Sequence, residues 1–230
     1  MAPAGTDRLA RKAFQSIVGV FLVTAALLFG IPWTLVYWQA WIFLIVYFAA
    51  SLLITARLLK TDPGLVERRM RAGPLAEKET SQKIIMLFAS IGFAGLIVVP
   101  ALDRRLGWSH MPPPIAVAGD ILVVLGWLAV WRVFRENSFT SATIEVADDQ
   151  KVISTGPYAY VRHPMYAGSL VMLLGIPIAL GSWWGLIALG VIAAALVWRI
   201  VDEERFLARR LAGYAAYKEK VRYRLIPHLW

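Results

Sequence analysis

The chain has 230 residues, of which 59% are hydrophobic and 17% charged, and its formal net charge at pH 7 is +9. This balance lies far from that of a soluble globular domain and indicates a protein of the lipid bilayer. The lack of cysteine excludes a disulfide framework and any thiolate nucleophile or thiolate metal site. The three histidines lie far apart and show no ligand spacing such as HExxH, so we expect no metal centre.

Six apolar segments are candidates for membrane spans, because a helix needs about 20 mostly apolar residues to cross a hydrocarbon core of about 30 Å. The first four cover residues 17–37, 41–59, 84–102 and 115–134. Two more, residues 165–180 and 183–201, are separated by Gly181 and Ser182 alone. The sequence therefore predicts an all-α, polytopic membrane helical bundle of about six transmembrane helices, the last two forming a tight hairpin.

Lysine and arginine are distributed unevenly across the connections between these segments. On one side lie 22 of the 24 basic residues, and only Arg104 and Arg105 fall on the other. The positive-inside rule then places both termini in the cytoplasm, in the inner membrane if the source is bacterial. The basic N-terminus precedes an apolar run that is too long for a signal peptide, so we expect it to be the first span. The positive charge matches anionic membrane lipid, and no nucleic-acid partner is expected.

Polar features are few in the first four spans. The connection 61–83 is expected to hold a short amphipathic helix around residues 65–70, with a solvated basic face near the lipid headgroups. Asp120 lies within the fourth span, where an ionisable residue is a functional candidate by default. Because it is close to the start of that span, we expect it to reach water.

A motif precedes the fifth span: residues 156–168 read GPYAYVRHPMYAG. Pro164 favours a helix start, since proline is tolerated in the first helical turn. Arg162 and His163 would then lie directly before the helix and Tyr166 just inside it. A helix end anchored by interfacial tyrosine and arginine would also explain this composition.

The second polar cluster lies at the end of the sixth span, in WRIVDEERFLARRLAGYAAYKEK. Arg199 and Glu203 are four residues apart and share one helix face, which is also the spacing of an ordinary intrahelical ion pair. A tight hairpin brings the end of the sixth span back to the start of the fifth. We therefore expect a convergence typical of a ligand site, in which Arg199, Glu203 and Glu204 face Tyr158, Arg162, His163 and Tyr166. Beyond Gly213 the basic, aromatic tail favours an amphipathic surface helix over a lid formed by Tyr214 and Tyr217.

The two motifs resemble the signature of the isoprenylcysteine carboxyl methyltransferase and phospholipid methyltransferase superfamily of integral membrane enzymes, over residues 137–227. The resemblance implies S-adenosyl-L-methionine bound at the cytosolic face and a lipid-like or prenylated small-molecule acceptor that enters from the bilayer. It divides the chain into a four-span membrane region, residues 1–136, and a cofactor-binding methyltransferase region, residues 137–230.

Site residues are carried over from the family residue by residue. The resemblance implies an acidic cofactor contact at Glu203, an acceptor carboxylate held by Arg199, and secondary roles for Arg162 and Glu204. The other implied cofactor contacts are Lys151, Val152, Ile153, Tyr158, His163, Pro164, Met165 and Tyr166. Pro157 departs from the residue usual in the eukaryotic prenylcysteine enzymes, so the acceptor is not transferred with the fold.

Chemistry leaves several acceptors open. A carboxylate on a lipophilic molecule is favoured because of Arg199, and it needs no general base near neutral pH. The amine of phosphatidylethanolamine is the alternative, for which Glu204 or His163 would accept a proton. A thiol or another small hydrophobic acceptor is also compatible. The competing classes are an NADPH-dependent reductase of the sterol type, whose members are longer, and a non-catalytic transporter or scaffold, for which we find no inverted repeats or midplane charges.

Overall fold

The computed structural model describes residues 4–77, 79–144 and 150–230. Within these ranges the chain forms eight α-helices and no strand, so the predicted all-α fold is confirmed. The long helices are α1 (Ala4–Gly30), α2 (Trp38–Thr61), α4 (Thr80–Leu106), α5 (Pro113–Glu136), α6 (Pro164–Ala179) and α7 (Gly185–Arg210). The short helices are α3 (Pro63–Met70), α8 (Tyr214–Lys220) and the 3₁₀ turns η1 (Pro74–Ala76) and η2 (Gly156–Ala159).

Five of the long helices, α1, α2, α4, α5 and α7, are long and apolar enough to cross a membrane, whereas α6 is apolar but only 16 residues long. Large apolar side chains on their outward faces are exposed, among them Leu53 at 70% and Ile187 at 63%. Exposed apolar surface of this extent marks a face that contacts lipid. The chain is an integral membrane protein.

Two predicted span boundaries are wrong. The window 17–37 corresponds to α1, which begins at Ala4 and ends at Gly30. Pro32 lacks a backbone N–H for a further helical hydrogen bond and Trp33 has a positive φ of 56°, so the chain leaves the helix and forms a turn here. At the other end of the chain, the window 183–201 corresponds to α7, which continues to Arg210. Glu203 and Glu204 are therefore helical.

The turn between α6 and α7 is longer than the predicted two residues and comprises residues 180–184. Gly181 has a φ of +74°, which favours glycine, and the backbone N–H of Gly185 donates to Ser182 Oγ at 3.1 Å. Helices α6 and α7 run antiparallel and touch, but α6 packs most extensively against α5, and α7 against α4. The hairpin is therefore looser than the sequence suggested.

Small residues let α5 and α6 approach closely. A Cβ added at Gly126 would lie 2.5 Å from the backbone nitrogen of Met172, and one at Gly175 would lie 2.6 Å from the carbonyl oxygen of Gly119. Such close approach is typical of helix interfaces inside membranes.

The same helix α5 also buries Asp120, which is 6% exposed, and neither carboxylate oxygen has a hydrogen-bond partner in the described part of the chain. The expectation that Asp120 reaches water is wrong.

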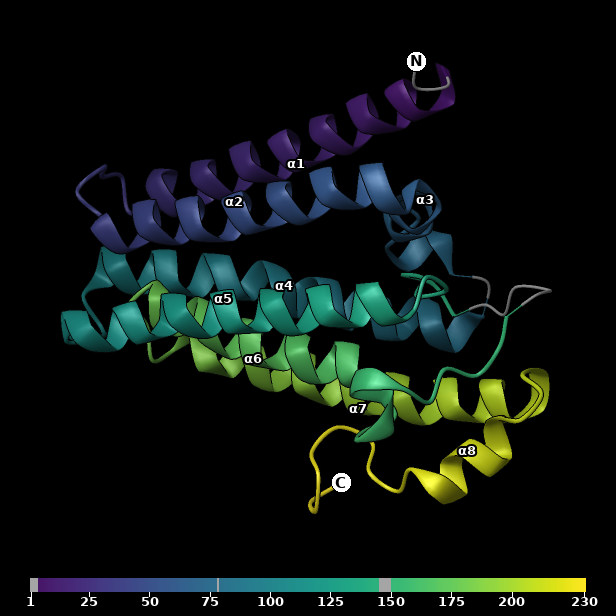
Figure 1. Cartoon of the computed structure of the whole chain (residues 1–230). Coiled ribbons are helices and arrows are strands. Elements are labelled where there is room, and N and C mark those ends of the chain that lie inside the picture. Colours follow the sequence, from purple (N-terminus) through teal and green to yellow (C-terminus); the bar gives the residue numbers. More distant parts are fainter. Residues whose placement is uncertain (1–3, 78, 145–149) are drawn as a thin grey trace.

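The helices pack as three layers around a main apolar core, with two smaller apolar clusters beside it. Figure 1 shows α1 with α2, then α4 with α5, then α6 with α7, and α8 lies against the outer layer. The core is built from every membrane-embedded helix; Phe43, Leu96, Val123, Ile176 and Ile192 are typical members. Both motifs lie at the end of this bundle where α3 and α8 are found (Figure 1).

Candidate active site

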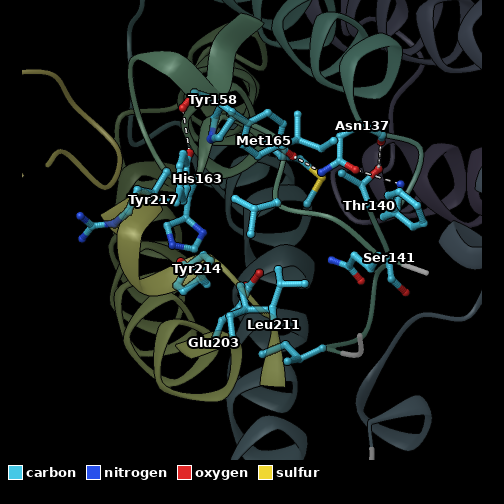
Figure 2. A pocket seen from close by; sticks show the side chains of 18 of the residues that line it. Asn137, Thr140, Ser141, Tyr158, His163, Met165, Glu203, Leu211, Tyr214 and Tyr217 are labelled. Atoms are coloured by element: carbon cyan, nitrogen blue, oxygen red, sulfur yellow. Dashed lines mark hydrogen bonds between the residues drawn. The ribbon is translucent and has the colours of Figure 1, made fainter. Parts of the chain in front are cut away.

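A pocket with a volume of about 110 Å³ opens at this end of the bundle. Four segments line it. They are the chain just after α5 (residues 137–144), the stretch 150–153, the start of α6 together with η2, and the end of α7 together with α8. Figure 2 shows Asn137, Thr140 and Ser141 on one side of the space and Glu203 and Tyr214 on the other.

All but one of the residues predicted for the site line this pocket. They are Lys151, Val152, Ile153, Tyr158, Arg162, His163, Pro164, Met165, Tyr166, Arg199 and Glu203. Glu204 is the exception: it is 3% exposed and lies behind the pocket wall. The predicted convergence of the two motifs is therefore present, although convergence alone assigns no role to any of these residues.

The centre of the convergence is a hydrogen-bonded chain across α6 and α7. Tyr166 Oη donates to Glu203 Oε2 at 2.7 Å and accepts from Arg199 Nε at 3.0 Å. This bridge replaces the intrahelical pair that the spacing of Arg199 and Glu203 allowed. Because Tyr166 separates the two charges, it orients the carboxylate of Glu203 at the pocket surface.

Arg199 is held by further partners from three other segments. Its Nη1 donates to Gln82 Oε1 at 2.9 Å, and its Nη2 donates to the carbonyl oxygen of Ala142 at 2.9 Å. The same Nη2 lies 2.9 Å from Glu77 Oε1, in an ion pair whose side chains are 6% and 2% exposed. A buried guanidinium needs such complete pairing to offset its desolvation. Arg199 thus already carries a carboxylate, that of Glu77.

Arg162 and Glu204 fasten the C-terminal segment to the start of α6. Glu204 lies 2.6 Å from Arg162 Nε, 3.3 Å from His163 Nε2 and 3.1 Å from Arg224 Nε. Arg162 Nη1 also donates to the carbonyl oxygens of Val221 and Arg222, each at 2.9 Å. The Nε and Nη1 donors of Arg162 therefore bind the protein itself. The expected proximity of Glu204 to Arg162 is present, whereas the contact of Arg162 with the C-terminal segment was not predicted.

Tyrosine side chains close the side of the pocket formed by η2 and α8. Asn137 Nδ2 donates to Tyr158 Oη at 3.0 Å, and Tyr217 Oη donates to the carbonyl oxygen of Tyr158 at 2.8 Å, which is drawn as a dashed line in Figure 2. Burial raises the pKa of Tyr158 to about 12, so its hydroxyl stays protonated near neutral pH.

Tyr214 differs from its neighbours because its hydroxyl has no hydrogen-bond partner in the described part of the chain. The residue is only 4% exposed and lines the pocket beside His163 and Glu203 (Figure 2). Burial raises the pKa of Tyr214 above its ordinary value, which keeps the hydroxyl a donor. A buried unsatisfied hydroxyl is costly, and it points to a ligand as the missing partner. The two tyrosines of α8 thus pack against the pocket, as the alternative interpretation had it, while the other residues of this helix stay exposed or partly exposed.

The contribution of α3 to the pocket was not predicted from the sequence. Arg69 Nη1 donates to the carbonyl oxygen of Ser141 at 2.9 Å, and Arg68 Nη2 donates to the carbonyl oxygen of Ser138. The guanidinium of Arg69 also lies over the ring of Phe134, 5.5 Å from its centroid. The expected amphipathic helix is present, but two arginines of its supposedly solvated face hold a pocket-lining connection in place.

The fold and the pocket together define an integral membrane protein with a polar and aromatic pocket at one end of its helix bundle. Residues 115–213 match the family model described as phospholipid methyltransferase. The match begins in α5, includes α6 and α7, and ends just before α8. Residues 115–213 therefore form a phospholipid methyltransferase domain, of the superfamily that the motifs resemble, and this domain supports a membrane methyltransferase. No curated protein gives a significant match to the chain.

Proposed function

We propose that this membrane methyltransferase uses S-adenosyl-L-methionine to methylate a carboxylate on a lipophilic acceptor. The observation that carries the proposal is the bridge from Tyr166 to Glu203, which joins two distant motifs in the wall of one pocket. The match to a methyltransferase family favours this class over the reductase and the transporter. Residues 137–230 would form the cofactor-binding region and residues 1–136 its membrane support.

The lining of the pocket fits the cofactor chemically. Glu203 would bind the ammonium group, because its Oε1 accepts no hydrogen bond within the described residues. Tyr214 would donate its unpaired hydroxyl to a ribose or carboxylate oxygen of the cofactor. The tyrosine and histidine rings, with Val152 and Leu211, would cover the adenine. When bound, S-adenosylmethionine supplies an electrophilic methyl group on a sulfonium.

The protein's contribution would be alignment and exclusion of water, since charges diminish as a methyl group leaves a sulfonium. Met165, Leu207 and Leu211 give the pocket an apolar side that keeps water out. Tyr166 would fix the carboxylate of Glu203, and His163 would be fixed by its contact with Glu204 and by stacking on the ring of Tyr166 at 5.7 Å. No nucleophile is required from the chain for this displacement.

Arg199 would bind the acceptor carboxylate in competition with Glu77. The ion pair between these residues at 2.9 Å is the kind of carboxylate contact that the acceptor would make. An incoming carboxylate would replace the side chain of Glu77, which belongs to the connection between η1 and α4. The exchange keeps the buried guanidinium paired throughout.

A phospholipid amine is the second candidate, because the matching family is described as phospholipid methyltransferase. An amine must lose a proton, and of the two predicted bases only His163 lines the pocket. Glu204 is engaged by Arg162 and Arg224, which stabilise its ionised form and make it a weak base. His163 would therefore accept the proton.

The pocket would face the cytoplasm, since 22 of the 24 basic residues lie on the connections at that end. The deciding experiment is methyl transfer from labelled S-adenosylmethionine by the purified full chain, offered a prenylated cysteine or phosphatidylethanolamine. Label that is released by mild base identifies an ester and supports the carboxylate; base-stable label in the lipid identifies the amine. Calorimetric binding of NADPH without binding of S-adenosylhomocysteine would overturn the whole assignment.

A further inference from the structure

We propose that a cleft between the first turns of α1 and helix α3 binds the headgroup of one anionic phospholipid. The cleft has a volume of about 1230 Å³ when the open space at its mouth is counted. It lies at the same end of the bundle as the methyltransferase pocket, but on the opposite outer layer (Figure 1). None of its lining residues belongs to that pocket.

The charges around the cleft match a phosphate group. Arg8 and Lys12 are one helical turn apart on α1, and Arg71 approaches from the end of α3. Glu67 is the one acidic residue that lines the cleft, and it pairs with Arg71 at 2.9 Å. Arg8 and Lys12 have no carboxylate within ion-pair distance among the residues that the structure describes. A net positive charge is thus left for an anion to neutralise.

The remaining lining suits a lipid rather than a free anion. Leu9 and Met70 present apolar surface beside the three cations, and Leu9 also packs against the apolar cluster at this end of the bundle. Arg8 and Lys12 lie in the first turns of a membrane-spanning helix, which is the depth of the lipid headgroups. Phosphate at the cations and acyl chain along the apolar surface would satisfy both parts of the cleft. A lipid of net negative charge matches it better than a zwitterionic one.

Lipid in this cleft would also steady the methyltransferase pocket. Helix α3 has eight residues, too few to be stable by itself, and it is capped by Asp62 Oδ1, which accepts from the Leu65 N–H at 2.9 Å. Arg71 follows this helix on the side of the cleft, whereas Arg68 and Arg69 hold the pocket-lining connection after α5. The bound headgroup and the pocket-lining chain after α5 would thus both contact α3 or the residue directly after it.

The test uses the purified full chain in nanodiscs of phosphatidylcholine with increasing phosphatidylglycerol, and retained lipid is counted by native mass spectrometry. Arg8→Gln and Lys12→Gln should each weaken retention of one phosphatidylglycerol molecule about fivefold, the effect of one basic residue near an anionic lipid. Arg11→Gln is the matched control, because Arg11 is exposed on the same helix but does not line the cleft. It should change retention less than twofold.

Equal losses in all three variants would overturn the proposal, because they would mean diffuse attraction to the membrane surface. Tighter binding of water-soluble glycerol phosphate than of the lipid would also overturn it, because the apolar part of the cleft would then contribute nothing. The readout needs no methyl transfer, so its failure leaves the proposed enzymatic function untouched. Unchanged thermal unfolding of the variants checks that each is folded.

Discussion

Replacement of Tyr214 by Phe should separate ligand binding from protein stability. The hydroxyl of Tyr214 is buried in the pocket wall and has no protein partner in the described part of the chain, so it contributes no hydrogen bond to the folded state. Leaving such a group unsatisfied costs about 1–3 kcal/mol. The variant without cofactor should therefore unfold at the same temperature as the natural protein or a higher one.

The same change should weaken cofactor binding. If the ligand supplies the missing acceptor, it recovers that cost of about 1–3 kcal/mol, which corresponds to a dissociation constant about 5- to 150-fold higher in Tyr214→Phe. The assay is calorimetric titration with S-adenosylhomocysteine, together with thermal unfolding in detergent. Tyr217→Phe is the matched control, because Tyr217 Oη already donates to the carbonyl oxygen of Tyr158 at 2.8 Å.

The control should show the opposite pattern, with a lower unfolding temperature and a smaller effect on affinity. Our reasoning is refuted if Tyr214→Phe destabilises the cofactor-free protein as Tyr217→Phe does and leaves the affinity for S-adenosylhomocysteine unchanged. That result would mean that the hydroxyl of Tyr214 contributes to the fold and does not face a ligand.

Four further predictions test other parts of the site and the fold. Glu203→Gln should weaken S-adenosylhomocysteine binding more than tenfold in calorimetry while the protein stays folded, because a charge-assisted contact of about 1.5–3 kcal/mol is lost. Glu77→Gln should lower the KM for a carboxylate acceptor if Glu77 competes for Arg199, whereas a raised KM and unchanged kcat would contradict that exchange. Arg199→Ala should destabilise the protein by about 3–5 kcal/mol, measured by thermal unfolding, because it leaves the buried carboxylate of Glu77 without its ion-pair partner. Gly126→Ala should lower the unfolding temperature by overpacking α5 against α6, at about 1–3 kcal/mol, and Gly19→Ala, which meets nothing within 4 Å, should not.

Hydropathy predicts most of this fold because bilayer thickness fixes how long an apolar helix must be. It fails at Pro32 and Trp33, where aromatic residues of a turn add to the apolar score without extending the helix. It also misses the partners of α6 and α7, because chain proximity suggests a hairpin, whereas Gly126 and Gly175 let α5 and α6 approach more closely. Interhelical packing depends on shape, which a one-dimensional window does not measure.

Motif spacing located the pocket but did not give the partners of each side chain. The spacing of Arg199 and Glu203 allows an ion pair, yet Tyr166 from α6 lies between them, and Glu77 comes from a distant connection. Amino-acid composition also does not distinguish a basic helix on the membrane surface from a basic helix whose side chains form or support the pocket wall. For α8 the available signal in the sequence was the three-residue spacing of Tyr214 and Tyr217 directly after Gly213. This spacing places both tyrosines on one helix face, and both are buried there.

The shortness of α6 has a consequence for how substrates reach the enzyme. Its 16 residues, at 1.5 Å each, measure about 24 Å, less than the hydrocarbon thickness of about 30 Å. Because the polar motif lies at the N-terminal end of this helix, the pocket would lie a few ångströms deeper than the phosphate groups of that leaflet. A lipophilic acceptor would then be methylated while its apolar tail stays in the leaflet that holds it. The water-soluble methyl donor would instead have to move below the headgroups to reach the pocket.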